Sequence, residues 1–253
     1  MIRVDHIQRT FGEQQVLKGI DTVFENGKTN LIIGRSGAGK TVLLKILVGL
    51  IEPSSGAIWY DDRNFSAMDV KSRKEIRTQI GMLFQGSALF DSMTVEQNIR
   101  FPLDMFTKET VKQKQMRVDE CLERVNLSNC HTKYPSEISG GMQKRVGIAR
   151  AIVLNPKYLF CDEPNSGLDP KTSIVIDELI HDITVERNIT TVINTHDMNS
   201  VMEIGDNINL LYLGELAWQG NKDEVLHSEN ILLQEFIFAS PFLQRLRNSY
   251  LSR

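Results

Sequence analysis

The chain has 253 residues, of which 41 % are apolar and 24 % are charged, and its formal net charge is −3. These values are those of an ordinary globular protein with a sizeable core, and the dispersed charge gives no electrostatic basis for binding nucleic acid. The cysteines Cys121, Cys130 and Cys161 form no C-x-x-C pair, so we expect reduced, buried thiols. We expect no signal peptide at the N-terminus, and no apolar run approaches the ~20 residues that span a bilayer.

The first part of the chain shows strand patterns followed by a glycine loop and a helix. Apolar residues alternate at 2–11 and at 16–24, which predicts two strands, and 29–33 is typical of a short buried strand. The next residues, 34–39, are too rich in glycine for regular structure. From Lys40 the apolar residues recur with the period of a helix.

The rest of the chain alternates between the two patterns. We predict strands at 57–60, 80–84, 158–161, 190–194 and 208–213, and helices at 69–79, at 107–128, from after Gly141 to about Leu154, and at 172–186. This alternation is typical of helices around a mostly parallel sheet. The predicted fold is therefore α/β, with a P-loop core formed by roughly 1–85 and 156–225 and a helical insertion between them.

The loop between the third strand and the first helix contains a complete phosphate-binding motif. It consists of Gly34, Arg35, Ser36, Gly37, Ala38, Gly39, Lys40 and Thr41, in the pattern G-x-x-x-x-G-K-[ST]. Glycines let successive N–H groups point at phosphates, and the dipole of the following helix favours the negative charge. We expect Lys40 to reach the β- and γ-phosphates of ATP and the Thr41 hydroxyl to bind Mg²⁺. A purely structural glycine loop is the alternative, and the flanking strand and helix argue against it.

The strand at 158–161 ends in two adjacent carboxylates, Asp162 and Glu163. Asp162, at the tip of the strand, suits Mg²⁺ coordination through water. Glu163 would face the γ-phosphate and orient the attacking water as a general base. Paired acids also occur as the polar start of a loop, but their combination with the glycine loop in one sheet favours a hydrolytic site.

Ser139, Gly140 and Gly141, shortly before the Asp162 strand, separate this chain from most P-loop proteins. With Lys144 and Arg145 after them, they resemble the signature loop of ATP-binding-cassette (ABC) ATPases. A serine hydroxyl and glycine N–H groups at a helix N-terminus bind anions. The resemblance implies a RecA-like P-loop core with an antiparallel β subdomain and a helical subdomain. It also implies that this loop serves the ATP of a second copy of the chain, so that a homodimer sandwiches two ATP molecules.

The resemblance extends to further residues of the nucleotide site. It implies that Phe11 stacks on adenine with Val16 beside it, and that Gln85 touches Mg²⁺ and reports the nucleotide state to a membrane partner. Asp169 lies in the loop that crosses the dimer interface in the family, and His196 lies where the family senses the γ-phosphate. Considered alone, Phe11 would be interpreted as a core residue and His196 as a structural one.

One position departs from the family pattern. The common signature ends in Gln, whereas Met142 holds that position here and Gln143 comes next. Methionine cannot donate the hydrogen bond that glutamine would, but Ser139 and the two glycines supply the main contacts, so we expect activity to survive. The run Gly-Gly-Met-Gln-Lys-Arg, together with residues 83–103, is similar to the lipid-handling cassettes of bacterial Mla/Mce systems.

This second resemblance implies a set of partners and a location. The partners are a multispanning permease and, through it, an Mce-domain lipid-binding protein, with no nucleic acid. The location is the cytoplasmic face of the inner membrane, through the permease. Leu89, Phe90, Met93 and Phe101 suit a groove for an amphipathic helix of the permease, although they can equally pack the helical insertion.

We predict an ABC ATPase domain at 1–230, with its helical subdomain at about 86–155, and a C-terminal tail at 231–253. The tail carries apolar and basic residues, namely Phe236, Ile237, Phe238, Phe242, Leu243, Leu246, Leu251, Arg245, Arg247 and Arg253. A basic amphipathic end is able to touch lipid, a partner chain or its own core. We favour its own core or the dimer mate.

Four functions remain to be weighed. The preferred one is the ATP-hydrolysing motor of a transporter that moves lipid, and an importer of another small solute is the alternative. A non-transport cassette is less favoured because the chain has one cassette, no long coiled-coil insertion and no basic domain. A P-loop phosphotransferase is disfavoured by Ser139–Gly141 and His196.

Overall fold

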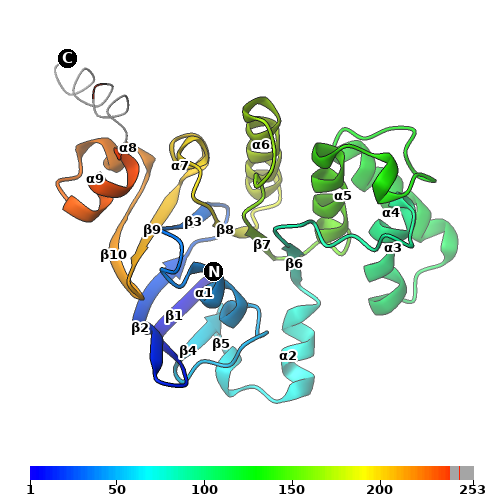
Figure 1. Cartoon of the computed structure of the whole chain (residues 1–253). Coiled ribbons are helices and arrows are strands. Elements are labelled where there is room, and N and C mark those ends of the chain that lie inside the picture. The colour runs from blue at the N-terminus through cyan, green and yellow to red at the C-terminus, as the bar shows by residue number, and fades with distance from the viewer. Residues whose placement is uncertain (240–244, 246–253) are drawn as a thin grey trace.

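Two β-sheets organise the chain in this computed structural model, which describes residues 1–239 and 245 (Figure 1). The first sheet has the order β2-β1-β4-β5 and its pairs are antiparallel. Its strands are β1 (Ile2–Phe11), β2 (Gln14–Phe24), β4 (Ser55–Tyr60) and β5 (Arg63–Asn64). It is the antiparallel β subdomain that the family resemblance implied.

The second sheet has the order β10-β9-β3-β8-β7-β6 and is parallel except for β10. Its strands are β3 (Thr29–Ile33), β6 (Ile80–Leu83), β7 (Tyr158–Asp162), β8 (Thr190–Asn194), β9 (Asn207–Tyr212) and β10 (Glu215–Gly220). In the register, Asp162 is opposite Asn194, and Asn194 is opposite Ile32. The carboxyl ends of β3, β7 and β8 therefore meet at one edge, where ligands of open α/β sheets bind.

The helices fall into groups around this sheet (Figure 1). They are α1 (Lys40–Leu47), α2 (Val70–Arg77), α3 (Val95–Phe106), α4 (Val111–Arg124), α5 (Gly140–Ile152), α6 (Pro170–Glu186), α7 (Met198–Ile204), α8 (Lys222–His227) and α9 (Ile231–Ile237), with 3₁₀ turns at Phe65–Ala67 and Pro135–Glu137. Helix α1 lies between the two sheets, whereas α6 and α7 cover the other face of the larger sheet. Within the described part of the chain, no helix has the length and apolarity that crossing a bilayer requires.

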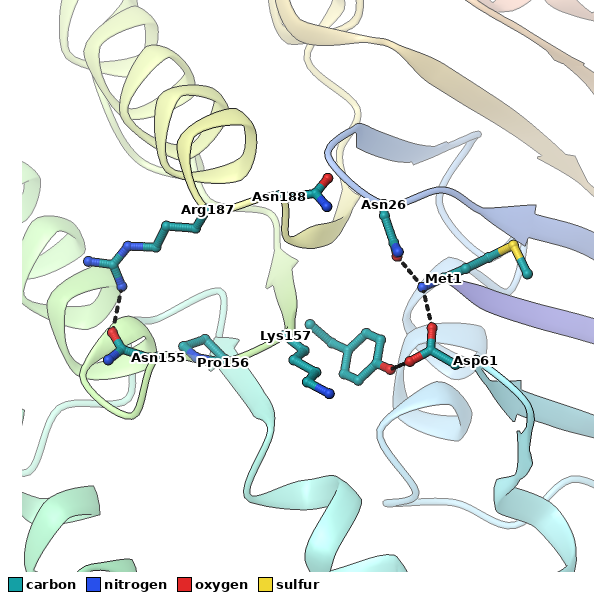
Figure 2. A pocket seen from close by; sticks show the side chains of 9 residues that line it. Met1, Asn26, Asp61, Asn155, Pro156, Lys157, Arg187 and Asn188 are labelled. Atoms are coloured by element: carbon teal, nitrogen blue, oxygen red, sulfur yellow. Dashed lines mark hydrogen bonds and ion pairs between the residues drawn. The ribbon is translucent and has the colours of Figure 1, made fainter.

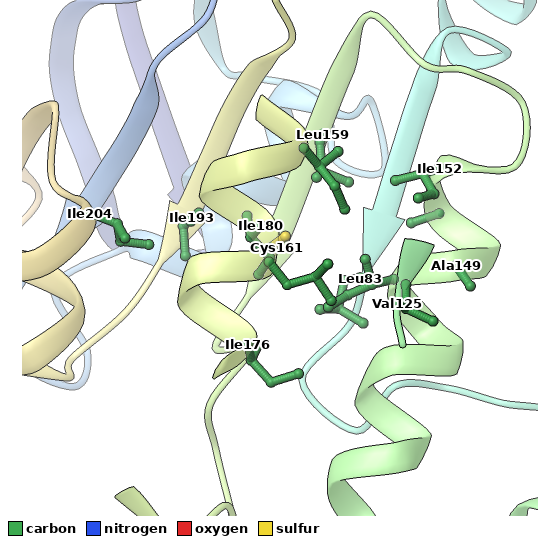
Figure 3. Packing of buried hydrophobic residues seen from close by; sticks show 14 of the residues in the cluster. Leu83, Val125, Ala149, Ile152, Leu159, Cys161, Ile176, Ile180, Ile193 and Ile204 are labelled. Carbon is green, nitrogen blue, oxygen red and sulfur yellow. The ribbon is translucent and has the colours of Figure 1, made fainter. Parts of the chain in front are cut away.

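Alternation along the buried strands separates two hydrophobic cores. Ile32 and Phe160 pack with α1 and the antiparallel sheet, whereas the next residues along the same strands, Ile33 and Cys161, point to the opposite face. This period of two follows from strand geometry. Figure 3 shows the second core, where Leu159 and Cys161 of β7 pack against Ile176 and Ile180 of α6 and residues of α5. The loops at the edge of the sheet are thus anchored from both sides.

The helical insertion differs in detail from the prediction. We expected a helix at 107–128, but α4 covers only Val111–Arg124, because Thr110 caps its first turn in a reciprocal capping box with Gln113. Helix α3 was not predicted, since Pro102 interrupts its interior and proline removes a backbone donor there. A capping box between Thr94 and Gln97 begins this helix.

The start of the C-terminal tail packs against its own chain. Leu233 and Ile237 of α9 are buried in the same core as α6 and α7, and Phe238 is buried beside them. Arg245 is exposed. The other residues of the predicted tail stripe lie outside the described residues, namely Phe242, Leu243, Leu246, Arg247, Leu251 and Arg253.

Candidate functional site

The predicted phosphate loop connects β3 to α1 at the carboxyl edge of the sheet. Gly34 and Gly39 have φ values of 144° and 104°, which L side chains rarely adopt. A side chain at Gly34 would also collide with the carbonyl oxygen of Leu211 in β9. The loop therefore needs glycine at both positions, as the motif predicted.

Lys40 closes this loop on itself. Its side chain is 8 % exposed, and Nζ donates to the carbonyl oxygens of Gly34 at 2.8 Å and Arg35 at 3.3 Å. Burial lowers the pKa of Lys40, while the negative charges of Glu163 and Asp162 act in the opposite direction. The ammonium is thus held between the loop and the carboxylates.

A cavity of about 750 Å³ opens beside Lys40. Most of the predicted loop residues line it, together with Val16, Gln85, Glu163 and His196, and its lining also includes Gln14, Val42 and Phe236. Of the predicted nucleotide-site residues, Phe11, Ala38, Ser139, Gly140, Gly141, Asp162 and Asp169 are not among those that line it. The structure therefore brings the phosphate loop, Gln85, Glu163 and His196 together, but leaves the signature loop apart from them.

The two carboxylates occupy different environments at the end of β7. Asp162 is 9 % exposed, and its Oδ1 accepts a hydrogen bond from Asn194 Nδ2 at 3.0 Å. Glu163 has a left-handed backbone, with φ of 47°, and its N–H donates to the Asn194 carbonyl at 3.0 Å. Non-glycine residues held in this conformation cluster at functional sites. Sequence reasoning missed Asn194, which holds both residues from the neighbouring strand.

The side chain of Glu163 is the point where three predicted residues converge. Its Oε1 lies 3.2 Å from His196 Nδ1, and its Oε2 accepts a hydrogen bond from Gln85 Nε2 at 3.2 Å. Gln85 follows β6 and His196 follows β8, so these groups come from strands on both sides of β7. The arrangement places a carboxylate, an imidazole and an amide together at the mouth of the cavity.

Helix α5 holds the segment that carries Gln85. Lys144 is buried, and its Nζ donates to the backbone carbonyl of Gln85. Burial lowers the pKa of Lys144, while Cys161 and the two carboxylates oppose this effect. Arg150 donates to the carbonyls of Ser87 at 2.6 Å and Ala88 at 2.7 Å. The sequence predicted α5 as the helix after the signature loop. It did not indicate that α5 also holds the segment that carries Gln85.

The signature loop lies on the surface. Ser139 and Gly140 are exposed, and Ser139 caps α5 by accepting a hydrogen bond from the Met142 N–H at 3.3 Å. Met142 packs against the larger core. Gln143 Nε2 donates to the Pro135 carbonyl at 2.9 Å, so the glutamine that follows Met142 stabilises the loop from inside its own chain.

Phe11 and Asp169 also lie outside the cavity. Phe11 is 42 % exposed, and the guanidinium of Arg9 lies 4.4 Å from its ring centroid. Asp169 caps α6, accepting hydrogen bonds from the N–H and hydroxyl of Thr172 at 3.1 and 2.5 Å, and these bonds lower its pKa. Phe11 and Asp169 are therefore accessible at the surface, and neither lines the cavity beside Lys40.

The C-terminal helix contributes to the cavity, which sequence reasoning did not predict. Phe236 of α9 lines it, and Glu235 lies 4.0 Å from the guanidinium of Arg35 in the phosphate loop. Both groups of this ion pair are more than half exposed, so its contribution to stability is small. The only sequence signal was the apolar stripe of the tail, which does not specify a contact.

A separate cavity of about 610 Å³ lies at the opposite edge of the sheet (Figure 2). Several of its polar groups pair with one another. The Tyr158 hydroxyl donates to Asp61 at 2.7 Å, and Arg187 donates to Asn155 at 2.9 Å. None of the residues predicted to bind nucleotide lines it. The cavity beside Lys40 is therefore the candidate functional site.

Comparison with known protein families decides the family. The family model described as ABC transporter matches residues 17–166, a range that includes the phosphate loop, the signature loop and both carboxylates. The chain belongs to the ABC transporter family. This is a family of ATP-hydrolysing cassettes, and the predicted α/β fold with a P-loop core is confirmed.

Curated relatives of this ABC cassette carry different substrate names. A probable ribonucleotide transport ATP-binding protein of Mycobacterium tuberculosis is 37 % identical over 236 residues, which cover 93 % of this chain. The chain spans 66 % of the length of that relative. A methionine import ATP-binding protein of Carboxydothermus hydrogenoformans is 39 % identical over 243 residues, covering 94 % of this chain and 71 % of the relative.

Two solved ABC cassettes share the architecture. A dimeric structure of the bacterial ABC transporter cassette MJ0796 aligns with a TM-score of 0.81 at 30 % identity, covering 88 % of this chain and 99 % of that one. The cassette CbiO1 of Clostridium perfringens, part of an ABC transporter complex, aligns with a TM-score of 0.84 at 30 % identity, covering 98 % of both chains. MJ0796 was also solved as a dimer in a post-hydrolysis state with ADP and phosphate.

Proposed function

We propose that this ABC cassette binds MgATP in the cavity beside Lys40 and hydrolyses it as the motor subunit of a membrane transporter. The convergence of Gln85, His196 and Lys40 around the carboxylates of β7 carries the proposal. Phosphoryl transfer to water needs little besides positioned cations, a positioned water and a group that takes its proton. The cavity contains residues suited to each of these tasks.

In this mechanism the phosphate loop and Lys40 bind the β- and γ-phosphates. Glu163 orients the attacking water and accepts its proton, while His196 contacts the γ-phosphate and holds Glu163 in place. Gln85 links the site to the segment held by α5.

The oxygen donors at the site fit Mg²⁺. The Thr41 hydroxyl, the Gln85 amide oxygen and the Asp162 carboxylate would hold the ion, directly or through water, since Mg²⁺ takes few protein oxygen ligands and keeps several waters. Within the described residues, no group of three or more His, Cys, Asp or Glu side chains gathers in a way that would hold a metal by itself. When bound, Mg²⁺ would neutralise charge on the phosphates.

We further propose that the working unit is a homodimer. Ser139 and Gly140 are exposed and the signature loop does not line the cavity beside Lys40, so its anion-binding N–H groups are free to serve the ATP of a second copy. The dimeric state of MJ0796 supports this assignment. Both Asp169 and Phe11 lie at the surface. Asp169 would contact the second copy, and Phe11 would contact the adenine of bound ATP.

For the cargo we propose lipid, through a permease and an Mce-domain protein, with the cassette on the cytoplasmic face of the membrane. The support is the run Gly140–Arg145 and the aromatic pair of Phe90 and half-buried Phe101, whose ring centroids lie 4.9 Å apart. Phe90 is 41 % exposed, which suits contact with an amphipathic helix of the permease.

Import of a small solute such as methionine is the second candidate. The methionine import relative, at 39 % identity over most of this chain, favours it. The two are separated by purifying the cassette with its permease, reconstituting the complex in phospholipid vesicles and following both cargoes. ATP-dependent transfer of labelled phospholipid supports the first proposal, whereas uptake of methionine without lipid transfer supports the second.

The catalytic assignment is tested by Glu163→Gln. We expect ATP binding within about twofold of wild type and hydrolysis reduced by about 10²-fold or more, because the amide cannot accept the proton of water. Glu178→Gln on α6 exchanges an exposed carboxylate in the same way and should hydrolyse ATP normally. Wild-type hydrolysis by Glu163→Gln would remove Glu163 from the role of base.

A further inference from the structure

A buried polar cluster lies next to the loop that carries Glu163. It consists of Asn165, Asp177 and Ser200, which are 8 %, 3 % and 1 % exposed. Asn165 belongs to the loop after β7, Asp177 to the interior of α6 and Ser200 to α7. Three segments of the chain therefore meet at these side chains.

The three side chains form a closed triangle of hydrogen bonds. Asn165 Nδ2 donates to Asp177 Oδ2 at 2.9 Å and to Ser200 Oγ at 3.1 Å. Ser200 Oγ donates to the same Asp177 Oδ2 at 2.7 Å. One carboxylate oxygen thus accepts from both neighbouring segments at once, and α6 acts as the fixed support.

This triangle joins the two segments that carry the proposed catalytic pair. Asn165 follows Glu163 by two residues, and Ser200 follows His196 by four. Glu163 Oε1 and His196 Nδ1 lie 3.2 Å apart, so a small shift of either segment would break their contact. Glu163, Asn165 and His196 all line a cavity of about 420 Å³, so the pair is not enclosed by packing on every side.

The cluster lowers the stability of the folded state. Asp177 Oδ1 and Asn165 Oδ1 are buried, and neither has a hydrogen-bond partner within the described residues. A buried polar atom without a partner costs about 1–3 kcal/mol, and a well-packed apolar cluster would avoid that cost. A buried polar group of this kind next to the proposed reaction centre points to a role in function.

We propose that Asn165, Asp177 and Ser200 are positioning residues for ATP hydrolysis. Their triangle holds the Glu163 loop and the His196 segment in the relative geometry in which the carboxylate and the imidazole meet. The inference rests on the roles proposed above for these two residues. None of the three touches the phosphates, so their removal should change turnover and leave ATP affinity alone.

The experiment measures kcat, KM for ATP and thermal stability of the full chain with MgATP. We expect Ser200→Ala and Asp177→Ala each to lower kcat by about tenfold or more, with KM unchanged, because small misplacements of catalytic groups have effects of this size. The double variant Asn165→Ala/Ser200→Ala should lose no more than either single variant, since both break one triangle. Asp177→Asn keeps an acceptor oxygen and should recover most of the kcat that Asp177→Ala loses.

Thr184→Val provides the matched control. Thr184 is a fully buried residue of the same helix, and its hydroxyl bonds the Ile180 carbonyl at 2.7 Å and the Thr191 hydroxyl at 2.6 Å. This variant should lose stability and keep its kcat. If Ser200→Ala and Asp177→Ala behave like it, with lower stability and wild-type kcat at temperatures where they are folded, the positioning role is overturned.

Glu163→Gln, measured in parallel, separates this inference from the proposed function. An inactive Glu163→Gln together with fully active triangle variants overturns the positioning role alone. An active Glu163→Gln overturns the role of Glu163 as base and this inference with it. A wild-type chain without any ATP hydrolysis overturns the proposed function itself.

Discussion

At the scale of single residues, Glu163 and Asp177 show two uses of a carboxylate in one site. Glu163 has a left-handed backbone and contacts Gln85 and His196 at the cavity mouth, where water and phosphate can reach it. Asp177 is enclosed, and burial raises its pKa to about 6, while hydrogen bonds from Ser200 and Asn165 act in the opposite direction. The first carboxylate is the one that we propose to react, and the second is the one that we propose to support it.

The raised pKa of Asp177 predicts how stability depends on pH. The folded state retains a proton on Asp177 up to about pH 6, whereas an unfolded aspartate loses it near 3.8. Stability therefore falls as the pH rises through this window and stays lower above it. The free energy of unfolding falls by at most roughly 3 kcal/mol across this window.

Asp177→Asn should remove this penalty. At pH 7.5 we expect a higher free energy of unfolding than wild type in urea titrations, and the difference should shrink as the pH falls below 6. Asp182→Asn, at an exposed position of the same helix, is the control and should show neither effect. A pH-independent loss of stability in Asp177→Asn would contradict the prediction.

At the scale of elements, α5 connects two functional loops. Its N-terminus is capped by Ser139 of the signature loop, and its body holds the segment after Gln85 through Lys144 and Arg150. Ser87 and Ala88 in that segment have φ values of 60° and 46°, which cost energy for residues other than glycine. The bonds from Arg150 offset this strain.

Arg150→Ala should therefore loosen the segment 85–93 in particular. Hydrogen bonds to a charged donor contribute about 1.5–3 kcal/mol, so amide hydrogen exchange in the segment should accelerate by about tenfold or more, with little change in β7 or β8. Arg145→Ala, which removes one 3.4 Å bond from the same helix to Asn126, should leave exchange there unchanged. Equal acceleration in both variants would show that α5 as a whole had been destabilised.

At the scale of the whole molecule, the two loops that we propose to form one nucleotide site do not meet within one copy of the chain. The phosphate loop is anchored between the two sheets, whereas the signature loop lies with the helices beyond β6 (Figure 1). Strands β8, β7 and β6 lie between them, so we expect that one copy does not close the site on its own.

Hydrolysis should consequently depend on the concentration of the chain. If two copies assemble around ATP, the rate per chain rises with protein concentration and levels off when the dimer is saturated. Glu163→Gln with MgATP should elute as a dimer in size-exclusion chromatography and as a monomer without nucleotide. A rate per chain that is constant across a hundred-fold dilution, with Glu163→Gln monomeric in MgATP, would exclude the shared site.

Much of the local structure was predictable because it depends on residues close in sequence. The period of the apolar residues indicated most strands and helices, and the glycine loop from Gly34 to Thr41 indicated its own conformation. Helix α3 was not predicted because Pro102 breaks the pattern that identifies a helix, and the contacts of α3 with the insertion stabilise it regardless. Strand β10 and helix α7 were also missing from the prediction.

The sequence by itself determined the family, the phosphate loop and the carboxylates after β7, because these motifs are contiguous and their chemistry depends on spacing along the chain. Only the tertiary structure decided which side chains meet. Asn194 bonds Asp162 across two strands, and Asp177 gathers Asn165 and Ser200 from separate segments. These contacts arise from the order of parallel strands and the packing of α6, which bring together residues distant in sequence without leaving a local pattern.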